Sequence, residues 1–113
     1  MRPTLRAGDR LLVDPTEYRA RGPQCGDVIV LGDPDDRRRW LVKRVAALAG
    51  QPFPGPVVPG DDDRVPPQHV YVLADDRTAG RDSRSFGPVP VSSVVGRVWY
   101  RTAPTDRAGP IPP

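Results

Sequence analysis

Lys43 is the only lysine in this chain, although lysine and arginine together contribute seventeen residues. Arginine keeps its proton in proteins, whereas a lysine that is removed from water can lose its proton and become a neutral base. Lys43 lies within the run WLVKRV at 40–45, whose apolar members would lower its pKa by desolvation. The residue alone leaves two interpretations open: a general base, or a surface lysine in an arginine-rich composition.

The chain offers few other groups for catalysis or metal binding. The single cysteine, Cys25, excludes an internal disulfide, and its position beside Gly26 predicts a small buried residue or a turn residue. The single histidine, His69, precedes a strand-like run and is predicted to be structural. Because a metal site needs several ligands at suitable spacing, we expect no metal and no cofactor.

The charge composition raises the hypothesis of a basic nucleic-acid-binding barrel. The net charge is +3 and the isoelectric point is 9.6. However, the arginines are mixed with acids, as in DPDDRRR at 33–39 and DDDR at 61–64, which is typical of a solvated surface. Aromatic residues make up only 6% of the chain, too few for a base-stacking platform. We therefore expect no nucleic-acid partner.

Short strands joined by turns must position these groups. Sixteen prolines and eleven glycines in 113 residues argue against long helices. Apolar and β-branched runs predict strands at 10–14, 27–31, 39–48, 69–73 and 93–101, with a short additional candidate at 57–58. Gly96 predicts a bulge in the last of these strands. The expected fold class is all-β, a small coiled sheet or barrel with little or no helix.

The connecting segments define one small domain. The charged segment 32–38 predicts a hairpin loop, 51–67 a surface loop, and 14–24 no more than a helical turn. We expect the domain to cover 1–103 and a flexible Pro-rich tail to cover 104–113. No apolar stretch approaches the roughly twenty residues of a membrane span, so we expect the chain as written to be soluble, or the soluble part of something longer.

Several segments, taken in order, form a recognisable set. These segments are MRPTL at 1–5 with Gly8-Asp9, GDVIV at 26–30, LVKRV at 41–45, ADDR at 74–77 and DSRSFGPVP at 82–90. The ordered set resembles the signal peptidase I family of serine endopeptidases, in a minimal bacterial form, over nearly the whole chain. The resemblance implies the fold of the signal peptidase catalytic core and the cleavage of signal or leader peptides from precursor proteins.

The resemblance also implies a Ser/Lys dyad, in which a serine hydroxyl attacks the scissile carbonyl and a neutral lysine takes its proton. Lys43 matches the general base. The family's nucleophilic serine immediately precedes the position of Met1, so it is absent from the chain as numbered and is expected just before it. The residues implied to support the site are Pro3, Thr4, Arg44, Asp75, Asp82, Ser83 and Arg84.

Within this supporting set, Asp82 and Arg84 are expected to form an internal ion pair that holds the loop over Lys43, with Arg44 as a candidate third member. Two positions depart from the family pattern. Ala74-Asp75-Asp76 stands where Gly-Asp-Asn is usual, and Gly80 stands where a serine often hydrogen-bonds the catalytic lysine. A water molecule or Ser83 is the candidate for that serine's role.

The resemblance implies that an extended peptide from a secreted or processed precursor protein binds by strand addition. The strand edges would be 1–6 and 39–42, and the residues implied to contact the substrate are Leu5, Trp40, Leu41 and Val42. The family usually acts at the outer face of the bacterial cytoplasmic membrane. Membrane association of this protein would come through a segment before Met1.

Two alternatives remain open. A non-catalytic relative that binds extended peptides is favoured by the missing serine and the altered positions, whereas the retained lysine argues against it. A specialised processing protease of the same family, which cuts one dedicated precursor, is also compatible with the short linker at 51–67.

Overall fold

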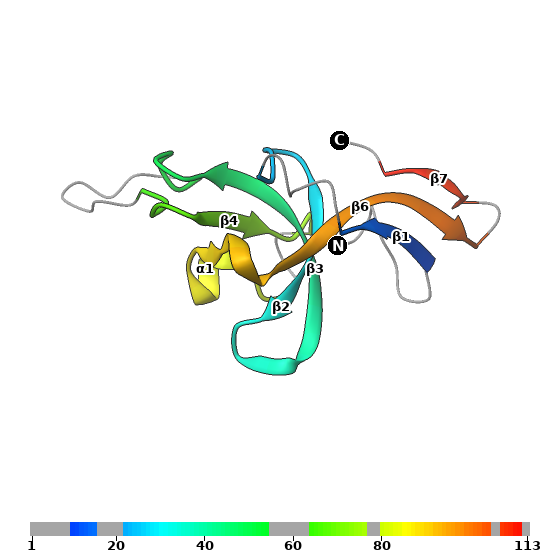
Figure 1. Cartoon of the computed structure of the whole chain (residues 1–113), viewed down its shortest axis with the longest axis horizontal. Helices are drawn as coiled ribbons and strands as arrows, with labels where there is room; N and C mark the ends of the chain where they lie inside the picture. Colours follow the sequence, from blue (N-terminus) through cyan, green and yellow to red (C-terminus); the bar gives the residue numbers. More distant parts are fainter. Residues whose placement is uncertain (1–9, 16–21, 55–63, 77–79, 105–106, 112–113) are drawn as a thin grey trace.

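A single antiparallel sheet forms most of the molecule (Figure 1). The computed structural model describes residues 10–15, 22–54, 64–76, 80–104 and 107–111. Within these residues, seven strands pair in the order β1-β6-β2-β3-β4-β5, and β7 adds to β6. The strands are β1 (Arg10–Asp14), β2 (Val28–Asp33), β3 (Asp36–Leu48), β4 (His69–Leu73), β5 (Val89–Pro90), β6 (Val94–Ala103) and β7 (Gly109–Pro110).

The helical elements in this part of the chain are short: the one-turn α1 (Ser83–Phe86) and the 3₁₀ turn η2 (Val91–Ser93), with 3₁₀ geometry also at Arg107. The all-β prediction is therefore confirmed. Each of the five strands predicted from the sequence is present, as β1, β2, β3, β4 and β6. The candidate strand at 57–58 and most of the helical turn predicted at 14–24 lie outside the described residues.

The β2–β3 hairpin is tighter than the sequence predicted. β2 ends at Asp33 and β3 begins at Asp36, so only Pro34 and Asp35 form the turn, and the loop predicted over 32–38 is wrong. The two arginines at 38 and 39 are exposed. Their charges stay in water while their backbone joins the sheet, so a run of charge does not exclude a strand.

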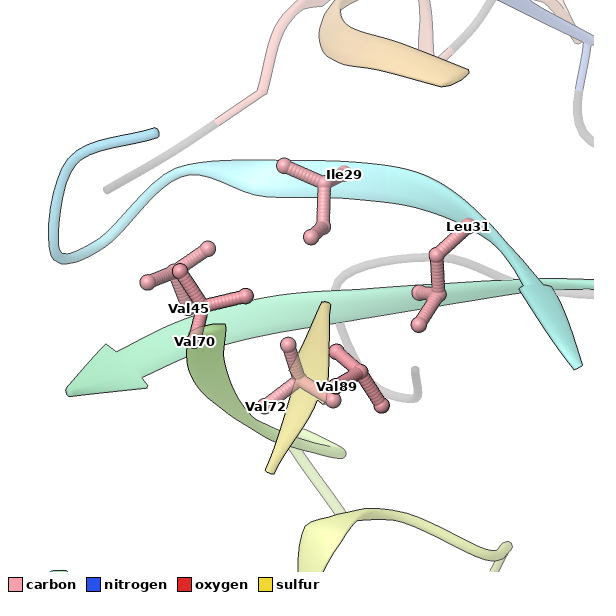
Figure 2. Close-up of a cluster of buried hydrophobic side chains, with 6 residues drawn as sticks. All are labelled: Ile29, Leu31, Val45, Val70, Val72 and Val89. Carbon is pink, nitrogen blue, oxygen red and sulfur yellow. The ribbon is translucent and has the colours of Figure 1, made fainter. Parts of the chain in front are cut away.

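β2 is buried on both of its faces, because successive side chains of a strand point to opposite sides. Ile29 and Leu31 belong to a cluster with Val45, Val70, Val72 and Val89 (Figure 2). Val28 and Val30 contribute to a second cluster with Val98 on the other face. The neighbouring strand β3 is therefore paired to a strand whose residues are mostly buried.

β6 carries the bulge that the sequence predicted at Gly96. The β2–β6 register shifts between Val30 and Leu31, opposite Gly96 and Val94. A Cβ atom on Gly96 would lie 2.5 Å from the carbonyl oxygen of Asp14. Glycine at this position therefore allows the end of β1 to approach β6 closely.

The end of the chain contacts β6 more extensively than expected for a flexible tail. Gly109 and Pro110 pair with Arg101 and Tyr100, and Ile111 packs against the Val28 cluster. Proline has no backbone N–H, but it is tolerated on an edge strand. The domain boundary at 103 itself stays a prediction.

β3 changes its environment along its length. β2 pairs with β3 from Trp40 to Arg44, whereas β4 pairs with β3 only from Arg44 to Leu48. The side of β3 at 40–43 that faces away from β2 therefore has no strand partner among the described residues. This free edge lies directly before Arg44.

Candidate functional site

Lys43 is buried in the middle of β3, with 6% of the residue exposed. It pairs with Ile29 of β2. The alternation of the strand places it on the same face as Leu41 and Val45, which pack in the Ile29 cluster. Burial lowers the pKa of Lys43 below its usual range, and this effect outweighs the opposing attraction of the Asp82 carboxylate.

The amine of Lys43 is covered by the backbone of Gly80. Gly80 has a φ of +79°, and a Cβ atom there would lie 3.2 Å from Lys43 Nζ. Lys43 makes no hydrogen bond or ion pair within the described residues. In that part of the chain, every fully buried side-chain nitrogen or oxygen atom has a hydrogen-bond partner. It follows that Nζ is not completely buried.

Asp82 and Arg84 form the ion pair that the sequence predicted. Asp82 is 1% exposed and caps the N-terminus of α1. Its Oδ2 accepts a hydrogen bond from Arg84 Nη2 at 2.8 Å and another from Ala74 N–H at 3.0 Å. Burial would raise the pKa of Asp82, but the hydrogen bonds from Arg84 and from the backbone of Ala74 outweigh it and lower this pKa.

Ser83 is also buried, and its Oγ accepts a hydrogen bond from the Val72 N–H of β4 at 2.9 Å. No hydrogen bond joins Ser83 to Lys43 among the described residues. The hydroxyl therefore docks α1 on β4. The hypothesis that Ser83 replaces the family's lysine-bonding serine receives no support from this geometry.

Arg44 belongs to a different ion pair from the one considered in the sequence. Its Nε and Nη2 donate to the two carboxylate oxygens of Asp75 at 2.8 and 3.1 Å, and its Nη1 donates to the Gly26 carbonyl at 2.7 Å. Arg44 follows Lys43 directly, so its side chain leaves the opposite face of β3. The suggested link from Arg44 to Asp82 and Arg84 is therefore wrong, while Asp75 does anchor the chain after β4.

Arg81 is a site neighbour that sequence reasoning missed. Its guanidinium forms ion pairs with Asp33 and Asp35 at the β2–β3 turn. The hydrogen bond from Arg81 is the main cause that lowers the pKa of Asp33. Nothing in the spacing indicated this pairing, because Arg81 and Asp33 are 48 positions apart.

The candidate substrate contacts fall partly within the described residues. Trp40 is 69% exposed, and Leu41 and Val42 are half-buried on opposite faces of β3. All three lie on the free edge defined above. Pro3, Thr4 and Leu5 lie outside the described residues.

The remaining polar groups show no metal centre in the described part of the chain, since no three His, Cys, Asp or Glu residues gather there.

Cys25 lies in the expected turn, but it is exposed and not buried. A pocket of about 230 Å³ lies beside it and is lined in part by Arg44 and Arg97, not by Lys43. Among the helices described, none is long and apolar enough to span a membrane.

Comparisons with known proteins agree on one family. The family model described as signal peptidase, peptidase S26, matches residues 1–53 and 56–102. The mitochondrial ATP-independent inner membrane protease subunit 1b of Arabidopsis thaliana is 35% identical, over 100% of this chain and 70% of the relative. The probable signal peptidase I-1 of Synechocystis is 32% identical, over 96% of this chain and 69% of the relative.

A solved structure shows the same fold. The crystal structure of a signal peptidase I from Enterococcus faecalis V583 matches with a TM-score of 0.56 and 23% identity, covering 68% of this chain and 97% of that chain.

Proposed function

This chain belongs to the signal peptidase family, peptidase S26, and we propose that it is a serine-type endopeptidase in which Lys43 is the general base. The signal peptidase function comes with the family and implies a precursor protein with a signal peptide as the substrate. The assignment of Lys43 is our own and rests on the chemistry of this residue.

The state of the Lys43 side chain is the observation that carries the proposal. The only lysine of the chain is 6% exposed, its pKa is lowered by burial, and it makes no ion pair within the described residues. A general base works best when its pKa lies near the working pH. Nζ is also not completely buried, which is compatible with the approach of a substrate.

The proposed reaction has two stages. Neutral Lys43 Nζ takes the proton of a serine hydroxyl as its oxygen attacks the scissile carbonyl, and the resulting ammonium gives this proton to the leaving amine, which leaves an acyl-enzyme. Lys43 then takes a proton from the water that attacks this ester and returns it to the serine oxygen as the acid product leaves. In the family motif the nucleophile stands one position before Met1, outside the printed sequence. N-terminal sequencing of the protein from its native host tests whether a serine is there.

The free edge of β3 is proposed to hold the substrate. An extended peptide that pairs with residues 40–43 would place its carbonyl beside Lys43, because strand addition aligns the peptide with the strand. Leu41 faces the same side as Lys43 and is proposed to line the pocket for a small side chain. Action at a membrane surface is also proposed, since relatives of the chain are named inner membrane proteases.

Substitution of the lysine tests the reaction. In the protein that carries the serine, Lys43→Ala is expected to lower kcat for a signal-peptide substrate by about 10²- to 10⁴-fold. Lys43→Arg is expected to be equally inactive, because arginine does not lose its proton. Arg64→Gln, at an exposed position whose Nη1 bonds the Gly50 carbonyl, is the control and should keep wild-type kcat. Cleavage by either Lys43 variant at the wild-type rate would rule out Lys43 as the general base.

Hydrogen exchange tests the binding site independently of cleavage. A signal peptide made uncleavable by a proline after the cut is expected to slow amide exchange within 39–43 of β3. The control segment is β4, His69–Leu73, which pairs with β3 from Val70 to Leu73 and with β5 at His69 and Val70, and it should not change. Protection without any cleavage by the serine-carrying protein would favour the alternative, a non-catalytic peptide-binding relative.

A further inference from the structure

The proposed base faces two carboxylates that could hold it in the wrong protonation state. Asp82 and Asp33 both raise the pKa of Lys43, whereas Arg81 and Arg84 both lower it. A carboxylate that paired with Lys43 would stabilise its ammonium form and remove the base. Yet Lys43 forms no ion pair within the described residues.

Each of the two carboxylates is bound by an arginine instead. Asp82 accepts hydrogen bonds from the Arg84 guanidinium, as described above. Asp33 accepts one from Arg81, and the Asp33 side chain has an exposed fraction of 0%. A buried carboxylate needs a partner, because the loss of hydration is expensive. An arginine satisfies this need at any pH that the protein meets, since its guanidinium does not deprotonate.

The position of Arg81 ties this second pair to the site. Arg81 directly follows Gly80, whose backbone covers Lys43 Nζ. Asp33 ends β2 two residues after Leu31, at a point where the β2–β3 register is irregular, and its side chain is fully buried. The Arg81 guanidinium also lies 6.0 Å from the ring centre of Phe86, which packs against that cluster.

We propose that Arg81 is a positioning residue of the site: by binding Asp33, it prevents this buried carboxylate from becoming the counter-ion of Lys43. The inference rests on the proposed role of Lys43 as base. Arg81 acts here through its charge and through its choice of partner, in addition to holding the Gly80 segment on the β2–β3 turn.

The single lysine allows a direct test. In the full chain labelled with ¹⁵N-lysine, the Nζ resonance of Lys43 is the only lysine side-chain signal, so its pH titration gives the pKa of this one group. Arg81→Gln is expected to raise this pKa, because the guanidinium charge is lost and Asp33 is left without its arginine. Asp33→Asn is expected not to raise it, because the competing charge is gone. The double variant should titrate below Arg81→Gln, because Asp33 can no longer act as the counter-ion. Arg64→Gln, which removes the same charge elsewhere, is the control and should leave it unchanged.

The directions of the pKa changes distinguish the proposal from a purely structural role, in which the Arg81–Asp33 contact acts only as a mechanical clamp. Both single variants break the Arg81–Asp33 contact, so a mechanical clamp would move the pKa of Lys43 in the same direction in both. An equal rise in Asp33→Asn, or no rise in Arg81→Gln, would overturn the proposal. If Arg81→Gln fails to fold, Asp33→Asn and the double variant still decide, because a rise in Asp33→Asn contradicts the proposal.

The same titration distinguishes a failure of the proposed function. An ordinary lysine pKa in the wild-type protein would reject Lys43 as base. A low pKa of Lys43 that stays the same in Arg81→Gln would reject only the role of Arg81. In the serine-carrying enzyme, kcat/KM rises with pH as Lys43 becomes neutral. Arg81→Gln should shift this rise to higher pH, and Asp33→Asn should not.

Discussion

Asp82 is a charged side chain that is almost entirely removed from water, with 1% of the residue exposed. It is satisfied by Arg84, by the Ala74 N–H, and by the Arg84 N–H at the start of α1. Asp82→Ala removes this helix cap and leaves the buried Ala74 N–H unpaired, so we expect the free energy of unfolding to fall by about 3 kcal/mol. Urea unfolding measures this change. Asp36→Ala, whose carboxylate accepts only a local N–H bond from Arg38, is the control and should change it by less than about 1 kcal/mol.

The same carboxylate predicts a loss of stability in acid. The pKa of Asp82 in the folded protein is lowered from 3.8, so the unfolded chain binds its proton first as the pH falls. The stabilisation is complete above the unfolded value and is lost as the pH falls through the lower folded value. Unfolding midpoints in urea measured from about pH 5 downward should therefore decline, and Asp82→Asn should flatten this decline. An equally steep decline in the variant would contradict the assignment.

At the scale of elements, the segment between β4 and α1 is defined by its contact with β3. Gly80 and Gly50 have similar backbone angles, with φ of +79° and +83°, but only Gly80 has Lys43 Nζ within 4 Å of its added Cβ. Alanine is strained at both positions, by about 1–2 kcal/mol each. Gly80→Ala should also displace the Lys43 Nζ resonance and reduce cleavage, whereas Gly50→Ala should do neither. Equal effects of the two variants on Lys43 would show that Gly80 does not cover the amine.

The strand β3 combines two tasks because its two ends have different partners. Arg44 to Leu48 pairs with β4 and anchors the strand between neighbours. The part before it, 40–43, pairs only with β2 among the described strands, and it carries Lys43. In the proposed function, Lys43 is held by the pairing of β3 with β2, and the edge of 40–43 that has no partner among the described strands binds the peptide.

At the scale of the whole molecule, β1 joins the sheet through a close contact with β6. Gly96→Ala would place a methyl group 2.5 Å from the Asp14 carbonyl oxygen, and a backbone atom cannot move away as a side-chain tip can. We expect a loss of about 3 kcal/mol in the free energy of unfolding and faster amide exchange in β1. Gly32→Ala, with nothing within 4 Å of the added Cβ, is the matched control and should change stability by less than about 1 kcal/mol. A small loss in Gly96→Ala would mean that β1 can shift without cost.

The position of β1 bears on the proposed function because the segment MRPTL at 1–5 precedes β1, with only residues 6–9 between them. In the resemblance this segment follows the nucleophile, whereas the proposed base is on β3. β6 and β2 lie between β1 and β3 in the sheet. Catalysis by a Ser/Lys pair would therefore depend on the packing of these four strands, even though the chemistry involves two side chains.

The sequence alone was sufficient for properties that depend on local pattern. The two-residue alternation of apolar side chains predicted the five main strands, and the ordered motifs predicted the family. The unique Lys43 in an apolar run, together with the family motif, favoured a buried amine, and the match of Asp82-Ser83-Arg84 to the family motif predicted the Asp82–Arg84 pair. These predictions succeed because neighbouring residues in a strand or turn have a fixed geometric relation.

Only the tertiary structure decided which distant groups meet. Arg44 binds Asp75 across 31 positions, and Arg81 binds Asp33 across 48. The sequence contains sixteen arginines, and its pattern does not distinguish the partner of one from the partner of another. The contact of Gly80 with Lys43 and the pairing of β7 with β6 depend likewise on how strands and loops are brought together. An ion pair forms where the packed backbone brings two charges within a few ångströms, and the sheet, not the local sequence, sets that distance.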